Sequence, residues 1–155
     1  MNYPELDFKD TLVPSIGKTG KMMGIYLSKR LRESQIDLTS KQWVLLKILH
    51  TQDGQPQNDL AVITERNKAS LVRLIHNMER KGLVLRKQDP MDKRINRIFL
   101  TSKGKITYGK TLPTVRSAFL DMQAGISQHE IEVVGAILDR ILDNIRKYEN
   151  SCKSI

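Results

Sequence analysis

The stretch KASLVRLIHNMERKGLVLRKQDPMDKRINRIFLT, residues 68–101, decides how this chain folds. In its first part Leu71, Ile75 and Met78 recur at the three- and four-residue spacing that puts apolar side chains on one face of an α-helix. Gly82 then favours the left-handed conformation that commonly ends a helix. After it, two short stretches rich in β-forming residues flank an Asp-Pro dipeptide. The stretch therefore predicts a helix followed directly by a β-hairpin.

The hairpin should have strands at 83–87 and 95–100, with a turn between them. Alternation along the second strand places Ile98 and Leu100 on the same face, where they can join a core. Helices are expected before and after this hairpin. It therefore has the position of a wing beside a helical domain.

Upstream of the stretch we expect a turn, a short helix and a four-residue link. Residues 53–56 have the composition of a turn, and the helix at 58–63 should place Leu60 and Ile63 inward. The link at 64–67 ends in an Asn, which can cap the next helix. Two helices joined by so few residues predict a helix-turn-helix.

A more apolar helix precedes this pattern. Thr39 and Gln42 have the spacing of a capping box, in which the hydroxyl accepts a helix N–H and the Gln side chain reaches back to the cap. The helix that they begin carries the apolar residues Trp43, Leu45, Leu46, Ile48 and Leu49. This composition predicts a central helix in the core.

Long helices are expected on both sides of this region. The first should end near residue 33, and Thr101 should cap another at about 102–124. Pro113 lies inside the second and should kink or divide it.

The last helix, at about 128–149, follows a second capping box formed by Ser127 and Glu130. It has one broad apolar stripe, made of Ile131, Val134, Leu138, Ile141, Ile145 and Tyr148. Such a stripe needs a partner. The first helix and a second copy of the chain are both candidates.

Positive charge is concentrated in one part of the chain. Residues 64–105 hold twelve Lys or Arg and four Asp or Glu, a net charge of 12 − 4 = +8, whereas the whole chain has 26 − 17 = +9. Charge this localised indicates a polyanionic partner for one region of the protein. A basic helix followed by a basic hairpin fits double-stranded DNA, with the helix in the major groove and the hairpin tip along the backbone or minor groove.

The side chains suited to DNA contact lie on the open side of the helix at 68–81 and in the hairpin. All of them can donate hydrogen bonds to a phosphate or a base edge. They are Lys68, Ser70, Arg73, Asn77, Arg80, Lys93, Arg94 and Arg97.

Other classes of protein are poorly supported. The chain has no apolar run near the ~18 residues of a membrane span and no signal segment, so we expect a cytoplasmic protein without a membrane partner. Its single cysteine, Cys152, and three scattered histidines provide no metal-ligand spacing. No nucleophile–base pair or phosphate-binding glycine loop is evident, so we expect neither a cofactor nor an enzymatic activity.

An ordered series of short motifs over about 38–105 resembles the multiple antibiotic resistance regulator (MarR) family. No single motif is specific, but their order is. The motifs are Leu38-Thr39, Gln42-Trp43, Leu45-Leu46, Asp59-Leu60-Ala61, Ser70 to Ile75, Met78 to Val84, Asp92-Lys93-Arg94 and Leu100 to Gly104.

The resemblance implies a mainly α fold with a small β-hairpin wing, in one domain spanning 1–155. A winged helix-turn-helix core at 38–104 would lie between dimerisation helices at 8–37 and 105–150. It also implies a homodimer that represses transcription from a palindromic site, usually relieved by a small molecule, often a phenolic compound.

Carried over by position, Arg73 would reach a base edge and Arg94 would enter the minor groove. Asp92 would brace the wing through a salt bridge. Lys93 departs from the usual first Arg of the wing tip, which keeps the attraction to phosphate but loses bidentate geometry. The early reactive cysteine of the peroxide-sensing branch is absent.

The alternative function is an architectural or protein-docking winged helix that never reads sequence. A binding titration separates the two, because a specific regulator prefers one palindrome over random DNA.

Overall fold

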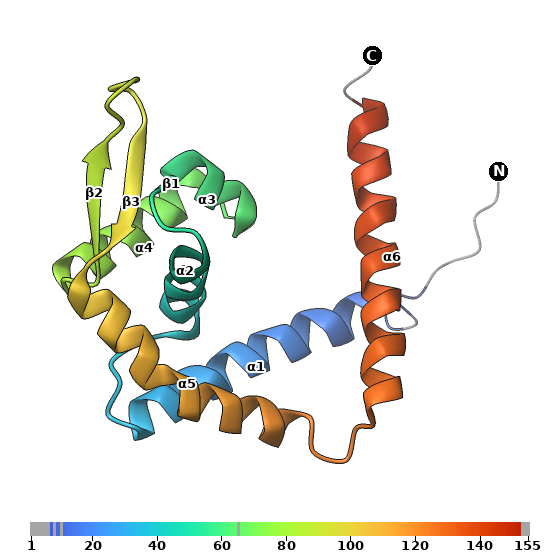
Figure 1. Ribbon diagram of the computed structural model, residues 1–155. Coiled ribbons are helices and arrows are strands. Elements are labelled where there is room, and N and C mark those ends of the chain that lie inside the picture. Colours follow the sequence, from blue (N-terminus) through green and yellow to red (C-terminus); the bar gives the residue numbers. More distant parts are fainter. Residues whose placement is uncertain (1–6, 8, 10, 65, 153–155) are drawn as a thin grey trace. The chain divides into compact units, whose positions relative to one another are not determined.

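The computed structural model describes residues 7, 9, 11–64 and 66–152. It contains two compact units, Met1–Phe119 and Leu120–Ile155. In chain order the elements are α1 (Val13–Glu33), α2 (Ser40–Thr51), β1 (Gln55–Pro56), α3 (Gln57–Ile63), α4 (Lys68–Arg80), β2 (Val84–Gln88), β3 (Asn96–Leu100), α5 (Ser102–Met122) and α6 (Gln128–Cys152) (Figure 1). The mainly helical fold with a small hairpin wing is confirmed.

The sheet has three antiparallel strands in the order β1-β3-β2. Leu85 lies opposite Phe99 in the hairpin, and Gln55 of β1 lies opposite Ile98. The prediction of a simple turn at 53–56 was therefore wrong, because its last two residues pair with a strand about forty residues away. Two residues are too few to show the alternation by which a strand is recognised.

The helix-turn-helix consists of α3 and α4. Asn67 caps α4 as predicted, with its side chain accepting the Ser70 N–H at 2.8 Å. Glu65, in the predicted link, lies outside the described residues. The buried side chains between and behind the two helices are Leu60, Ala61, Leu71, Ile75 and Met78.

The prediction that Ile63 points inward was wrong, since this residue is 52% exposed. Leu60 and Ala61 supply the buried face of α3 instead. At 3.6 residues per turn, Ile63 lies roughly 110° around the helix from the midpoint of these two side chains. A helix of seven residues has too few turns to show this from sequence.

Helix α2 is central to the core, as its composition predicted, and the capping box of Thr39 and Gln42 is present. Leu45, Leu46 and Leu49 are fully buried. The buried Trp43 indole N–H donates to the Thr111 hydroxyl at 3.0 Å, which ties α2 to α5.

Helices α1 and α5 pack with this core, so the compact unit extends beyond the winged region at 38–104. Leu27 and Leu31 of α1 are buried, and the Arg30 guanidinium donates to the Ser117 hydroxyl at 3.1 Å. The first unit ends at Phe119.

Helix α5 begins where the hairpin ends. The Thr101 hydroxyl accepts the Gly104 N–H at 2.9 Å and donates to the Gly82 carbonyl at 2.6 Å. It thereby joins the cap of α5 to the end of α4, where Gly82 has a φ of +68° as its position predicted. Pro113 does not divide α5, whose ribbon changes direction along its length (Figure 1).

The second unit contains α6. Ser127 and Glu130 form the predicted capping box, with N–H to carboxylate and N–H to hydroxyl distances of 2.8 and 3.3 Å. Of its apolar stripe, Val134 is 54% and Ile145 is 51% exposed. Among the described residues, no helix is long and apolar enough to span a membrane.

Gly104 provides a test of the packing between α5 and the end of α4. A Cβ at this position would lie 2.1 Å from the Leu83 carbonyl oxygen, whereas one at Gly109 on the same helix meets nothing within 4 Å. We expect Gly104→Ala to lower the free energy of unfolding by at least about 2 kcal/mol. The control Gly109→Ala should raise it by about 0.5–1 kcal/mol, because alanine is the better helix former.

Urea unfolding of both variants at one fixed protein concentration measures these changes, since assembly alters apparent stability. Equal stability of the two variants would contradict the close approach at Gly104.

Candidate nucleic-acid interface

The outer face of α4 carries polar side chains that project away from the core. Arg73, Asn77 and Arg80 are separated by four and three residues, so they share one face of the helix, and all three are exposed. Lys68 is exposed at the start of α4. Ser70 is half-buried, and its backbone N–H is occupied by the Asn67 cap. Four of the five candidate contacts on α4 are thus open to a ligand.

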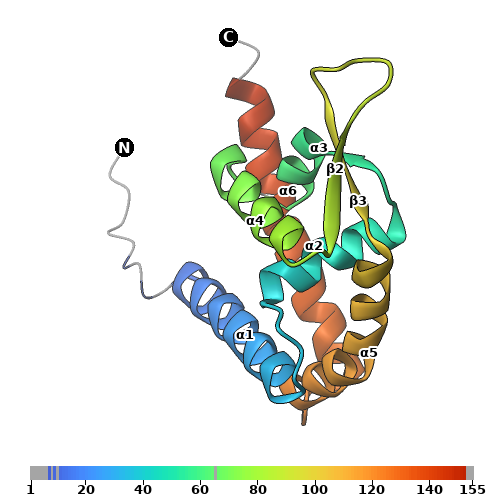
Figure 2. The same cartoon turned by 90° about the vertical axis from the view of Figure 1, so that its left-hand side faces the viewer.

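The position of α4 is fixed from its inner side. It contacts α3, α2 and β2, and the buried Leu71, Ile75 and Met78 form its inner face. An ion pair between Glu79 on α4 and Arg86 on β2, at 3.3 Å, further joins the helix to the hairpin. Figure 2 shows α4 beside the hairpin, whose tip extends well beyond the helix. The helix face and the wing therefore belong to the same compact unit.

Asp89 organises the turn of the hairpin, directly after the end of β2. This residue is only 6% exposed, and its carboxylate pairs with the Arg97 guanidinium. It also accepts the backbone N–H groups of Met91 and Asp92 at 2.8 and 3.2 Å. The hydrogen bond from Arg97 and then those two N–H groups lower the pKa of Asp89 from its ordinary value.

Arg97 has partners on two sides, because it also donates to the Gly54 carbonyl at 3.0 Å. Its guanidinium thus connects the hairpin turn to the segment before β1. Sequence reasoning placed Arg97 among the DNA contacts and missed the role of Asp89. The spacing of eight residues between the two, across a predicted hairpin, was the available signal.

Asp92 and Arg94 form a separate pair at the wing tip. The Arg94 Nε and Nη2 donate to the two carboxylate oxygens of Asp92, each at 3.0 Å. This pairing lowers the pKa of Asp92 and raises that of Arg94. The Arg94 side chain is nevertheless 91% exposed. Asp92 therefore holds the exposed arginine, while Asp89 holds the hairpin.

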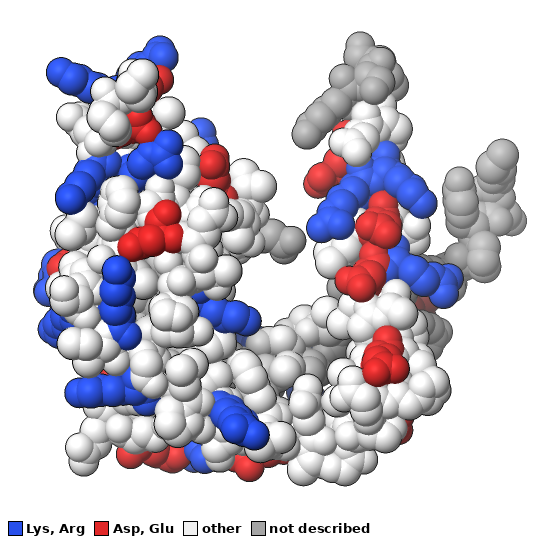
Figure 3. Space-filling view, in the orientation of Figure 1, with Lys and Arg blue, Asp and Glu red and all other residues white. Residues whose placement is uncertain are grey.

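The wing tip presents further exposed side chains. Lys93 is exposed beside Arg94, and Met91 is 93% exposed. Figure 3 shows Lys and Arg side chains at the tip and down the outer side of the hairpin, with acidic groups interspersed among them. Tip and helix face together form a basic surface, which we call the α4–wing surface and define by Lys68, Arg73, Asn77, Arg80, Lys93 and Arg94.

This surface has the geometry of nucleic-acid binding and not of a metal site. Within the described part of the chain, no three His, Cys, Asp or Glu residues gather where they would hold a metal ion. A helix-turn-helix with exposed cations on its second helix, followed by a basic hairpin, defines a winged helix-turn-helix of the DNA-binding class.

Comparisons with known proteins show which proteins the chain is similar to. Residues 38–95 match the model of the MarR family. The uncharacterized HTH-type transcriptional regulator YybA of Bacillus subtilis (strain 168) is 27% identical over 112 residues, which cover 72% of this chain and 75% of that protein. The part of the chain at 38–95 is thus similar to the MarR family.

Solved structures show the same similarity. MepR of S. aureus, crystallised in a complex with DNA, has a TM-score of 0.78 and 27% identity, over 86% of this chain and 98% of that one. BpsR of Bordetella bronchiseptica has a TM-score of 0.79 over 90% of this chain and 99% of that one, and the DNA binding of BpsR is regulated by 6-hydroxynicotinic acid. Because its sequence is only 18% identical to this chain, the comparison with BpsR shows a similar fold and nothing more.

The roles of Asp89 and Asp92 can be distinguished by substitution. Asp89→Asn removes the charge that holds Arg97, so we expect lower hydrogen-exchange protection of the Met91 and Asp92 amides at pH 7. Asp92→Asn is the matched control, since it releases Arg94 and leaves the ion pair between Asp89 and Arg97 in place.

The effect of Asp89 should depend on pH. Because the folded pKa is lowered from 3.8, its contribution is complete above that value and is lost as the pH falls through the folded pKa. Wild type and Asp89→Asn should thus differ at neutral pH and converge only in strong acid. Equal protection factors at pH 7 would show that Asp89 does not hold the hairpin.

Proposed function

We propose that this protein is a sequence-specific DNA-binding transcriptional regulator, and that it acts as a homodimer repressing transcription from a palindromic operator. The observation that carries the proposal is the α4–wing surface, in which exposed cations project from a helix and a hairpin held at a fixed angle. The DNA complex of MepR, a relative with 27% identity, supports double-stranded DNA as the partner.

In this proposal α4 enters the major groove. Arg73 and Asn77 lie on the outermost face of the helix, where Arg pairs with guanine and Asn with adenine. Lys68 and Arg80, near the two ends of α4, contact phosphates, and the Ser70 hydroxyl adds a shorter-range contact. Phosphate contacts orient the helix, and base contacts specify the sequence.

The wing contributes through the minor groove and the backbone. Arg94 suits a narrow minor groove, whose negative potential attracts a guanidinium. Asp92 orients Arg94, and Lys93 beside it neutralises a phosphate. The guanidinium of Arg97 is already bound by Asp89 and Gly54. Its contribution to binding is therefore to hold the wing in place.

A homodimer is supported by exposed apolar side chains on α6 and on α1, each taken by itself. On α6 Val134, Leu138 and Ile145 are 54%, 37% and 51% exposed. On α1 Val13 and Ile16 are 60% and 40% exposed. Exposed apolar surface of this kind marks an association site. A two-fold dimer would present two copies of α4 to a palindrome.

Response to a small molecule is the remaining part of the proposal. BpsR, which shares the fold, is described as regulated by 6-hydroxynicotinic acid. A small aromatic effector of phenolic type would fit the same scheme, in which ligand binding shifts the protein away from its DNA-binding conformation.

The decisive experiment is selection of duplexes from a random pool, followed by titration of the selected DNA and of random DNA. A specific regulator should prefer the selected palindrome by about 10³-fold or more. Binding should also weaken as salt is added. The logarithm of the association constant should fall against the logarithm of the salt concentration with a slope of about −0.9 for each phosphate neutralised. Equal affinity for both DNAs would leave an architectural or protein-docking role, the alternative function.

Arg73 and Arg94 should differ in what they read. Arg73→Ala should cost about 1–3 kcal/mol on the selected duplex and relax preference at one symmetric pair of positions. Arg94→Ala should cost most when the flanks are A·T-rich, because only these narrow the minor groove. Competition titrations with A·T and G·C flanks measure both effects.

Replacing the flanks with G·C should mimic the Arg94 loss in wild-type protein, and combining both changes should be less than additive. Simple additivity would make Arg94 an ordinary phosphate contact.

The dimer is tested on α6. Leu138→Glu with Ile141→Glu places two charges in the apolar stripe and should yield monomers that bind the palindrome poorly. Ala136→Glu, a charge on the opposite face of the same helix, should leave the dimer intact. Sedimentation measures the mass, and circular dichroism shows whether the helices remain. A folded dimer from the double variant would show that the stripe packs within one chain.

A further inference from the structure

Met91 at the wing tip is the most exposed large apolar side chain in the described part of the chain. It is 93% exposed, whereas Val62 and Tyr148, the next in order, are 78% and 72% exposed. A single exposed apolar residue is common on a protein surface, so exposure alone does not indicate a function. Met91 differs because it lies at the far end of the hairpin, on a loop whose conformation is well defined.

The loop around Met91 is fixed by its own hydrogen bonds. The Met91 N–H donates to the Asp89 carboxylate at 2.8 Å, and the ring of Pro90 between them restricts the backbone. Two backbone bonds close the loop, from the Asp89 N–H to the Ile95 carbonyl at 2.8 Å and from the Ile95 N–H to the Asp92 carbonyl at 2.9 Å. Met91 therefore projects from an ordered turn and not from a loose segment.

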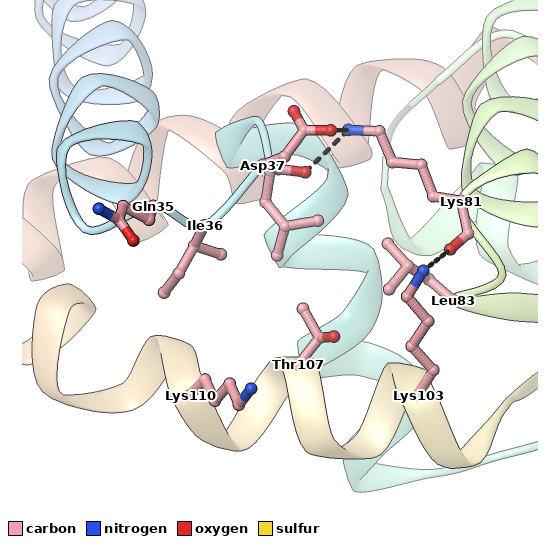
Figure 4. Close-up of a pocket in the computed structure, with 9 residues that line it drawn as sticks. Gln35, Ile36, Asp37, Lys81, Leu83, Lys103, Thr107 and Lys110 are labelled. Carbon is pink, nitrogen blue, oxygen red and sulfur yellow. Dashed lines mark hydrogen bonds and ion pairs between the residues drawn. The ribbon is translucent and has the colours of Figure 1, made fainter.

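The hairpin that carries this loop is also held where it leaves α4. The Lys81 ammonium contacts the Asp37 carboxylate at 2.9 Å, and the Lys103 ammonium donates to the Lys81 carbonyl at 2.7 Å (Figure 4). These contacts join the end of α4 to the link before α2 and to α5, just before β2 begins. A side chain at the tip of a hairpin supported in this way can press into a partner, whereas a loose hairpin would be pushed aside.

The neighbours of Met91 indicate which partner it meets. Lys93 and Arg94 are exposed and positively charged, and the one carboxylate among them, that of Asp92, is occupied by Arg94. Such a tip approaches a polyanion. Met is one of the side chains that proteins insert between base steps from the minor groove. Its unbranched, polarizable thioether fits irregular gaps and makes favourable contacts with aromatic rings, which bases also provide.

We propose that Met91 inserts between two base pairs from the minor groove and partly unstacks them, so that the wing selects a deformable base step beside the site read by α4. Arg94 favours a narrow groove, which stiff A-tracts provide, whereas insertion is easiest at flexible pyrimidine–purine steps such as TA. The two residues thus select different flanks of the same base composition. This inference deepens the proposed function and rests on it.

Two duplexes test the proposal. Both carry the selected site, flanked either by A-tracts or by alternating TA steps of equal length and base composition, and both are titrated at the same salt concentration. Met91→Gln keeps the length of the side chain but makes it polar. In this variant the affinity for the TA duplex, divided by that for the A-tract duplex, should fall by about fivefold or more, the lower end of what one base-pair position contributes.

Two further variants are controls for this ratio. Met91→Leu keeps an apolar wedge and should keep the wild-type ratio. Ile106→Ala removes an apolar side chain that is 61% exposed on α5, away from the hairpin, and should also leave the ratio unchanged. Because Met91 is almost fully exposed, its substitution should not alter the thermal unfolding of the protein.

Unstacking is measured directly with 2-aminopurine in place of one adenine of the TA step, since its fluorescence rises when the base leaves the stack. Saturating wild-type protein and Met91→Leu should raise the fluorescence, and Met91→Gln should not. An unchanged affinity ratio in Met91→Gln, an equal fall in Ile106→Ala, or no rise in fluorescence with wild type would overturn the insertion.

Both measurements are repeated on random duplexes with the same two flanks, which separates the insertion from the proposed function. If no site can be selected, but fluorescence rises on the random TA duplex with wild type and not with Met91→Gln, the proposed function is refuted and the insertion stands. If a site is selected and the ratio and the fluorescence do not depend on Met91, the proposed function stands and the insertion is refuted.

Discussion

The wing depends on the ion pair between Asp89 and Arg97. Asp89 is nearly buried, and a buried carboxylate is tolerated only when its oxygens are satisfied. Arg97 and two backbone N–H groups satisfy them, and the same guanidinium reaches the Gly54 carbonyl. One cluster thus connects the turn of the hairpin, strand β3 and the segment before β1. This cluster therefore fixes the loop of the hairpin relative to the three-stranded sheet.

Further contacts hold the wing at a defined position relative to the exposed cations of α4. Asp53 adds a second connection at the opposite end of β3, where its carboxylate accepts the Leu100 N–H at 2.9 Å. Glu79 and Arg86 then relate the hairpin to α4. Cations held at defined positions pair with phosphates at lower entropic cost than the same charges on mobile segments. The net positive charge of residues 64–105 indicates a polyanionic partner. The contacts of Asp53, Glu79 and Arg86 explain why the α4–wing surface has a defined shape.

Features set by neighbours in sequence were predictable. The capping boxes at Thr39 and Ser127, the Asn67 cap and the stripe of α4 each depend on residues three or four apart, a spacing visible in the chain. Strand β1 was not predictable, because its partner lies about forty residues away and it has only two residues. Asp89 was missed for a related reason, since its role appears only when the hairpin brings Arg97 beside it.

The two wing acids illustrate how the same pair of residue types performs two tasks. Asp89 is shielded, and its arginine is bound on both sides, so the pair resists exchange with an outside partner. Asp92 forms an equally well-aligned pair, but Arg94 is 91% exposed, and water weakens the attraction. An approaching phosphate or base edge can therefore replace Asp92 at small cost, while until then the pairing limits the rotamers of Arg94. Burial, and not charge, separates the arginine that supports the wing from the arginine that is available to DNA.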